Sequence, residues 1–182
     1  MLPLKNISIL LLEPQSPANI GSVARVMKNM GLTSLYLINP QTEINAESFQ
    51  LACGADDILA AARRTETLAE TLQPFSLCVG TTSRSVDTFP RVLTPHQLAT
   101  QIAEFSSESQ IALLFGPERT GLTNEQVQYC QWLVLKSHDI VHTEKYQDVV
   151  HKAGGKDAGK SCGRSPEGDW SGSCPRLVSF RS

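Results

Sequence analysis

Short runs of uninterrupted apolar residues, separated by helix-like segments, constrain the fold of this chain more than any other feature. The runs occupy residues 7–12, 34–38, 75–79, 111–115 and 132–135. A strand that is apolar at every position is buried on both faces, as in a parallel sheet covered by helices on both sides. We therefore expect an α/β fold with a mostly parallel sheet and helices on both of its faces.

The intervening segments carry helical signals. Apolar residues recur on one face of the stretch 17–30, and Gly31 follows it as a stop signal. We expect further helices at 47–53, 67–72, 95–105 and 123–129, the last of them capped by Thr123.

Composition and charge exclude several classes of protein. The 182 residues carry 41% hydrophobic residues and a net charge of −2, which indicates a globular chain and excludes a strongly basic, sequence-indifferent nucleic-acid binder. A local basic site remains compatible with this charge. No apolar run reaches the roughly 18 residues of a membrane span, and the N-terminus carries no signal-peptide pattern. We expect a cytoplasmic protein with reduced cysteines, of which Cys53 and Cys130 are small core residues.

The sequence changes character near residue 137. Residues 137–182 hold six of the twelve glycines and three of the four histidines, with no sustained apolar period. We expect one domain over 1–136, followed by a divergent, flexible tail over 137–182. The tail's histidines and cysteines lack the tight spacing of structural zinc sites, so no metal is expected.

Three segments that follow expected strands contain residues of the types that bind ligands or take part in catalysis. They lie at 13–21, 80–84 and 116–121. Ligands of parallel α/β sheets bind beyond the carboxyl ends of the strands, which makes these segments the candidate site.

The first segment leads into a helix that carries an unusual arginine. Asn19 is of a type that satisfies free amides at a helix start, and Gly21 allows another backbone to approach closely. Arg25 is flanked by apolar residues on both sides, so we do not expect it on a fully solvated face.

The motifs at these places are Asn-Ile-Gly-Ser-Val-Ala-Arg at 19–25, Val-Gly-Thr-Thr-Ser-Arg-Ser at 79–85 and Leu-Phe-Gly-Pro-Glu-Arg-Thr-Gly-Leu-Thr-Asn-Glu at 114–125. Jointly, and in this order and spacing, they resemble the SPOUT superfamily of RNA methyltransferases. The nearest branch is the TrmH/TrmJ-like family of tRNA and rRNA ribose 2′-O-methyltransferases. The resemblance covers about residues 4–136.

This resemblance implies a SPOUT-type fold with a trefoil knot near its C-terminal end, a homodimer, and S-adenosylmethionine as cofactor. It implies methyl transfer to a ribose 2′-hydroxyl, on tRNA rather than rRNA. The residues that it matches to cofactor contacts are Thr81, Thr82, Ser83, Gly116 and Lys136.

The resemblance also assigns catalytic and RNA-binding residues. Arg25 matches the family's catalytic arginine, and Asn19 and Glu118 match residues that hold it in place. RNA contacts are expected from Arg25 together with further basic residues at the same sheet edge, namely Lys28, Arg84 and Arg119. A guanidinium stays protonated and is a poor general base, so Arg25 is expected to stabilise the developing alkoxide or to grip a phosphate.

One family motif has no counterpart in this chain. The family follows its last strand with an Ile-Pro-rich turn and a Ser-Leu-Asn that opens a long apolar helix, whereas this chain reads Ser-His-Asp-Ile-Val-His from residue 137. The alternative function is therefore a non-catalytic RNA- or partner-binding domain that has lost the cofactor, and cofactor affinity separates the two. An unrelated nucleotide-binding enzyme is disfavoured because no glycine-rich phosphate motif is present.

Overall fold

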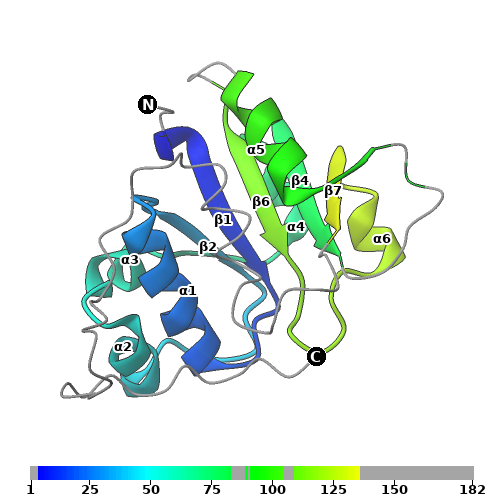
Figure 1. The fold of residues 1–182 in the computed structure, drawn as a ribbon. Helices are drawn as coiled ribbons and strands as arrows, with labels where there is room; N and C mark the ends of the chain where they lie inside the picture. Colours follow the sequence, from blue (N-terminus) through cyan, green and yellow to red (C-terminus); the bar gives the residue numbers. More distant parts are fainter. Residues whose placement is uncertain (1–3, 83–88, 90, 105–108, 136–182) are drawn as a thin grey trace, which may run out of the picture.

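A parallel β-sheet forms the centre of the protein (Figure 1). The computed structural model describes residues 4–82, 89, 91–104 and 109–135. In this part of the chain, a seven-stranded sheet has the order β3-β2-β1-β6-β4-β7-β5, and every neighbouring pair is parallel. The strands are β1 (Ile7–Leu12), β2 (Ser34–Ile38), β3 (Arg63–Thr65), β4 (Leu77–Thr82), β5 (Val92–Leu93), β6 (Ile111–Phe115) and β7 (Trp132–Leu135).

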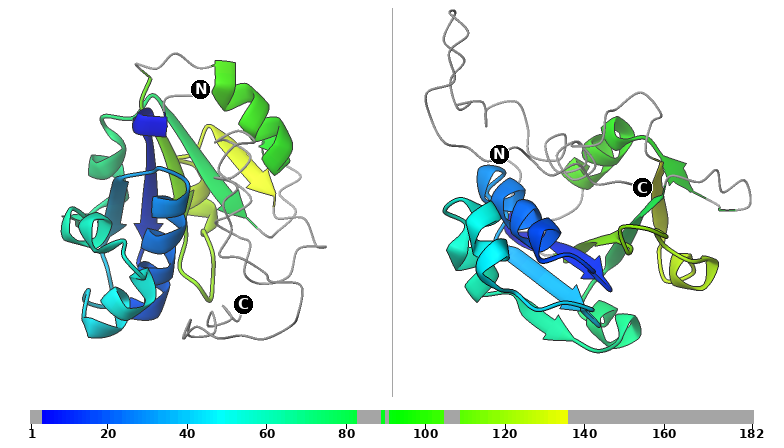
Figure 2. Two further views of the ribbon diagram at one scale, coloured as in Figure 1. Left: turned by 60° about the vertical axis from the view of Figure 1, so that its left-hand side comes forward. Right: turned by 90° about the horizontal axis from the view of Figure 1, so that it is seen from below.

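Helices cover both faces of this sheet (Figure 2). A 3₁₀ turn at Leu4–Asn6 precedes β1, and the helices are α1 (Pro17–Asn29), α2 (Ala46–Ala52), α3 (Asp56–Ala60), α4 (Leu68–Leu72), α5 (Pro95–Glu104) and α6 (Asn124–Val127). Apolar residues of α1, α3 and α5 pack on one face, and those of α4 and α6 pack on the other. The expected α/β sheet with helices on both faces is confirmed.

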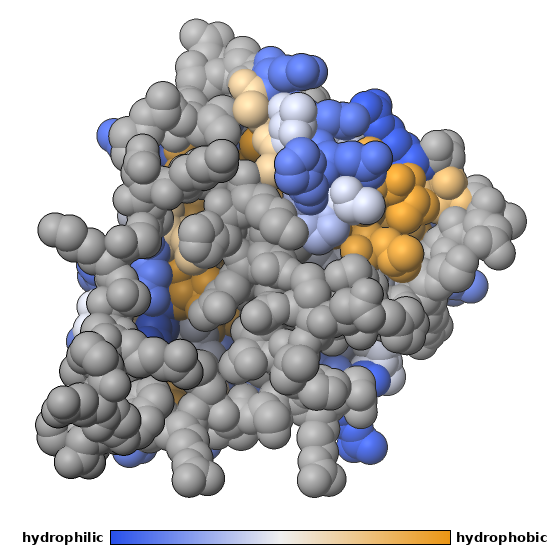
Figure 3. Space-filling view, viewed as in Figure 1, coloured by the Kyte–Doolittle hydropathy of each residue, from blue (hydrophilic) through white to orange (hydrophobic). Residues whose placement is uncertain are grey.

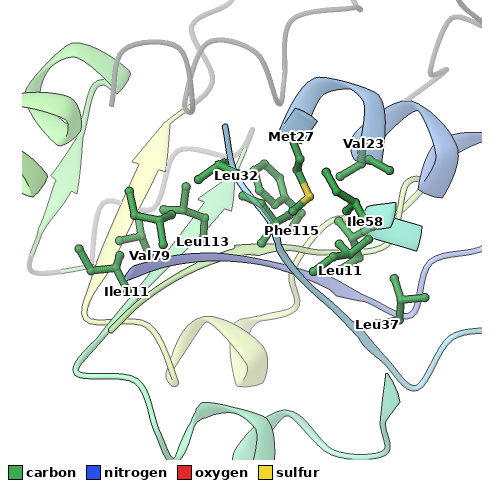
Figure 4. Packing of buried hydrophobic residues seen from close by; sticks show 14 of the residues in the cluster. Leu11, Val23, Met27, Leu32, Leu37, Ile58, Val79, Ile111, Leu113 and Phe115 are labelled. Atoms are coloured by element: carbon green, nitrogen blue, oxygen red, sulfur yellow. The ribbon is translucent and has the colours of Figure 1, made fainter. Parts of the chain in front are cut away.

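The core has two layers because successive residues of a strand point to opposite faces. All six residues of β1 are buried. Ile9 and Leu11 pack in the layer beneath α1, whereas Leu10 and Leu12 pack in the layer beneath α4 and α6. Figure 4 shows the first layer, where Met27 of α1 lies near the ring of Phe115. Continuous apolar runs therefore mark strands that contribute to both layers.

Some short elements and strand ends differ from the sequence expectations. The helices expected at 47–53, 67–72 and 123–129 are present as the short helices α2, α4 and α6. The elements α3, β3 and β5 were not expected, and β3 and β5, with three and two residues, are too short to show a period. Strand β4 continues through Gly80 and Thr81 to Thr82, so these residues belong to the sheet and not to a loop. The expectation that Cys53 is a core residue is wrong: Cys53 is exposed just after α2, with a left-handed backbone (φ +46°).

Several expectations concern residues that the structure does not describe. Ser83, Arg84, Lys136, the segment 137–182 and the trefoil knot all lie outside the described residues.

Large apolar side chains reach the surface at a few positions, among them Val92 and Leu135. Figure 3 shows exposed hydrophobic atoms on the side of the molecule where β7 lies. Among the described residues, no helix has the length and apolar character needed to cross a bilayer.

Candidate active site

The strand order brings the candidate segments to one edge of the sheet. Strand β6 lies between β1 and β4, and β4 is followed by β7. Since all are parallel, the residues after β1 and β6 emerge beside the ends of β4 and β7. The last residues of β4 and β7, Thr82 and Leu135, are direct partners in register. This edge is where parallel α/β sheets bind ligands.

The carboxylate of Glu118 joins two of these segments. It accepts hydrogen bonds from the backbone N–H of Gln15, at 3.3 Å to Oε1 and 3.1 Å to Oε2. The side-chain amide of Asn19 donates to Oε1 at 3.0 Å. Glu118 therefore lies against the first turn of α1, where the helix dipole stabilises a negative charge. The contact links the loop after β6 to the start of α1, which is about 100 residues earlier in the sequence.

Asn19 makes this contact because another residue caps the helix. Ser16 is the N-cap of α1, its hydroxyl accepts from the N–H of Asn19 at 3.4 Å, and Pro17 occupies the first helical turn. The expectation that Asn19 satisfies the free amides of the helix start is wrong. A serine followed by proline is the sequence signal that identifies the true cap.

Arg25 lies further along α1 and is half-buried, in agreement with the expectation of an incompletely solvated face. Its Nη1 lies 3.7 Å from Sγ of Cys53, the residue that follows α2. The structure thus brings Asn19 and Glu118 together at the start of α1 and gives Arg25 a contact on α2. That Glu118 and Asn19 hold Arg25 in place stays a prediction.

Gly21 has a packing role. A Cβ atom added at Gly21 would lie 2.1 Å from the carbonyl oxygen of Ser48 in α2. The absent side chain lets α1 and α2 approach closely, so the close backbone approach expected at Gly21 is made by a helix of this chain.

The residues matched to cofactor contacts lie at the ends of adjacent strands. Thr81 is buried and its hydroxyl donates to the carbonyl of Leu114 at 3.3 Å, while Thr82 is half-buried at the end of β4. Gly116 begins the loop after β6, and a Cβ there would lie 2.5 Å from the carbonyl carbon of Gly121. The loop folds back over Gly116 so closely that any side chain there would collide with its backbone, so the loop conformation alone requires glycine at this position. Backbone groups at neighbouring ends of β4 and β6 are compatible with a cofactor that lies across the edge.

The basic residues matched to RNA contacts are not all at this edge. Arg119 is exposed in the loop after β6. Lys28 lies in the last turn of α1, roughly 16 Å further along the helix axis than Pro17. Its Nζ is 2.7 Å from Oδ2 of Asp57 in α3, and this hydrogen bond lowers the pKa of the Asp57 carboxyl. The expected clustering of Lys28 with the other basic residues at the sheet edge is therefore wrong, because α1 runs away from that edge.

Two features of the site had no sequence signal. The N–H of Gln15 holds Glu118, and backbone groups cannot be identified from residue type. Cys78 in β4 and Cys130 after α6 have their sulfur atoms 3.8 Å apart beneath Gly80, although 52 residues separate them.

The sequence model of the SpoU rRNA Methylase family matches residues 6–138. The chain belongs to this family. The motif segments that meet at the carboxyl edge all lie within the matched range, so the site just described is a site of a SpoU family member.

Curated relatives agree with this placement in the SpoU family. Over 131 residues the chain is 42% identical to the tRNA (cytidine/uridine-2′-O-)-methyltransferase TrmJ of Escherichia coli O6:K15:H31 (strain 536 / UPEC). The match covers 72% of this chain and 53% of that protein. The chain therefore spans about half the length of the curated relatives it matches.

Solved structures share the fold. A probable methylase family protein from Haemophilus influenzae Rd KW20 superposes with a TM-score of 0.76 at 32% identity, covering 82% of this chain and 65% of that one. TrmJ from Z. mobilis ZM4 superposes with a TM-score of 0.73 at 30% identity, covering 83% of this chain and 70% of that one.

Proposed function

We propose that this chain carries the catalytic fold of a ribose 2′-O-methyltransferase that acts on tRNA and takes its methyl group from S-adenosylmethionine. The observation that carries the proposal is the contact of Glu118 with Asn19 and the N–H of Gln15. It joins the first and last motif segments at the carboxyl edge of a SpoU-family sheet. The 42% identity to TrmJ favours tRNA over rRNA as the substrate.

The cofactor would bind across the ends of β4, β6 and β7. Thr81, Thr82 and Ser83 would approach it from β4, Gly116 from β6, and Lys136 from the residue after β7. When bound, S-adenosylmethionine supplies an electrophilic methyl group on sulfur. This chain's residues then need to hold the ribose hydroxyl in line with that methyl, and positioning of this kind contributes on the order of 7–11 kcal/mol at best.

Arg25 would act on the attacking oxygen. A guanidinium remains charged and presents several N–H donors in a fixed plane, so it stabilises an alkoxide or a neighbouring phosphate rather than removing a proton. Asn19 and Glu118 would fix the start of α1 and, through it, the direction of Arg25. Arg119 and Arg84 would add phosphate contacts that weaken with salt.

The assembly and organisation of the protein are part of the proposal. We infer a homodimer in the cytoplasm, with residues 1–136 as the methyltransferase domain and 137–182 as a divergent segment. One sequence observation favours a second candidate function, a non-catalytic RNA- or partner-binding domain: the family's Ser-Leu-Asn motif is missing from this chain.

The direct test is methyl transfer to a tRNA transcript, read by mass spectrometry of the nucleosides. We expect 2′-O-methylated product from the wild-type chain and a loss on the order of 100-fold in Arg25→Ala, as when one transition-state donor is removed. Arg64→Ala, on the edge strand β3 where Arg64 is paired with Glu43, is the matched control and should keep full activity.

Two results would overturn parts of this proposal. If Arg25→Lys keeps full activity, the planar arrangement of N–H donors on the Arg25 guanidinium is not needed, and the role assigned to Arg25 fails. If the folded wild-type chain binds no S-adenosylmethionine and methylates no tRNA, the methyltransferase proposal fails and the non-catalytic function replaces it.

A further inference from the structure

Phe49 of α2 is exposed on the surface that Arg25 reaches. The described part of the chain contains four phenylalanines, and Phe49, with 42% of its surface accessible, is the exposed one among them. A phenylalanine ring has no polar group to interact with water, so its exposure leaves apolar surface that binding to another aromatic group would cover.

The position of Phe49 relative to Arg25 follows from the helix. Ser48, the residue before Phe49, packs against Gly21, and Arg25 lies one turn beyond Gly21 on α1. Cys53 directly follows the last residue of α2, about one turn after Phe49. The Sγ atom of Cys53 is the atom that Nη1 of Arg25 approaches to 3.7 Å. The ring and the guanidinium therefore border the same stretch of surface between α1 and α2. The acidic Glu47 is two residues from Phe49, about 200° around the helix, on the opposite flank of α2.

This surface is rigid. The side chain of Asn45 accepts from the N–H groups of Glu47 and Ser48, and the Ser48 hydroxyl accepts in return from the N–H of Asn45, a capping box that fixes the start of α2. The close contact of Gly21 with Ser48 holds α2 against α1. The backbones that carry Phe49 and Arg25 thus keep their relative positions without a ligand, which lowers the cost of binding.

We propose that Phe49 is a stacking platform for an unpaired base of the RNA substrate, next to the nucleotide whose ribose Arg25 contacts. Aromatic rings stack on the faces of unpaired bases, and a guanidinium beside them attracts the adjoining phosphate. A cation and an exposed ring on one rigid surface favour a nucleic acid over an apolar protein partner. This inference rests on the proposed function and names how its substrate is held.

The test measures RNA binding by fluorescence anisotropy with the full chain. The probes are a fluorescein-labelled anticodon stem–loop RNA, which has unpaired bases, and a fully paired RNA duplex of the same length. We expect Phe49→Ala to weaken binding of the stem–loop roughly 10-fold, the order of effect that one base–aromatic stack has. Binding of the duplex should not change, and Phe49→Trp should bind the stem–loop as well as the wild type does.

Tyr129, which follows α6 and is 47% exposed, gives the matched control. Tyr129→Ala should bind both probes like the wild type. Equal stem–loop affinity in Phe49→Ala and wild type would overturn the inference and leave the proposed function standing. So would a loss in Phe49→Ala that accompanies a change of oligomeric state in sedimentation, since Phe49 would then contact a second copy. A wild-type chain that binds neither RNA would overturn both the inference and the proposed function.

Discussion

Glu118 is the residue through which the loop after β6 fixes the start of α1. Its carboxylate receives three hydrogen-bond contacts from two groups, the N–H of Gln15 and the amide of Asn19. Bonds to a charged acceptor are worth about 1.5–3 kcal/mol when they are shielded from water, and a half-buried carboxylate keeps only part of this.

We therefore predict that Glu118→Ala lowers the free energy of unfolding by about 1–2 kcal/mol, because two donors lose their charged acceptor. Urea unfolding followed by circular dichroism measures this. The control is Glu66→Ala, at an exposed carboxylate, which should change stability by less than about 0.5 kcal/mol. Equal midpoints for the two variants would show that the contact contributes nothing to the fold.

At this scale, the sequence identified residue types better than their partners. The motif that contains Glu118 and the one that contains Asn19 were both recognised, and the structure brings these two side chains together. The N–H of Gln15 was not predictable, since every residue except proline has that group. The partner of Lys28 was also missed, because Asp57 belongs to the undetected helix α3.

At the scale of the elements, the contact between α1 and α2 depends on one glycine, Gly21. Helix α2 is short and buries only Ser48 and Ala52, so its position depends on packing against α1. At Gly21 this packing brings the Ser48 carbonyl to where a Cβ would be.

We predict that Gly21→Ala destabilises the chain by about 1–3 kcal/mol, the usual cost of overpacking, although alanine is the better helix former. The unfolding midpoint in urea gives the measurement. Asn29→Ala, at the exposed end of α1, is the matched control and should be neutral or slightly stabilising. A Gly21→Ala variant as stable as wild type would mean that α2 moves away from α1 without cost.

Most helices and strands were predictable from the sequence, whereas α3, β3 and β5 were not. Strands β1, β2, β6 and β7 and helices α1 and α5 agree with expectation to within a residue or so, because each has several apolar residues at a regular period. The end of β4 was misjudged because Gly80 and Thr81 are turn-forming types that neighbouring strands nevertheless hold in the sheet. Tertiary pairing decided that boundary over local preference.

At the scale of the whole molecule, the fold buries two cysteines side by side that are 52 residues apart in the sequence. Cys78 and Cys130 lie in the core layer beneath α4 and α6, with their sulfur atoms 3.8 Å apart. The contact with Cys130 and burial both raise the pKa of the Cys78 thiol far above its ordinary value of 9.0. The thiol therefore stays neutral in the folded protein, and the thiolate that reacts with electrophiles is not formed.

We predict that iodoacetamide modifies exposed Cys53 rapidly and leaves Cys78 and Cys130 unmodified until the chain unfolds. Peptide mapping by mass spectrometry, with and without urea, distinguishes the sites. The same raised pKa implies that stability falls as the pH rises above 9.0, because the unfolded chain then ionises Cys78 while the folded chain does not. Labelling of Cys78 at the rate of Cys53 without urea would contradict this packing.

Binding of S-adenosylmethionine tests the central claim, that the edge formed by β4, β6 and β7 is the cofactor site of a methyltransferase. Isothermal titration calorimetry on the full chain measures it directly, with circular dichroism to verify that the sample is folded. The account predicts saturable binding at one site per chain with micromolar affinity. A folded sample that takes up no S-adenosylmethionine would contradict it, and the chain would then be a SpoU-family scaffold without the family's chemistry.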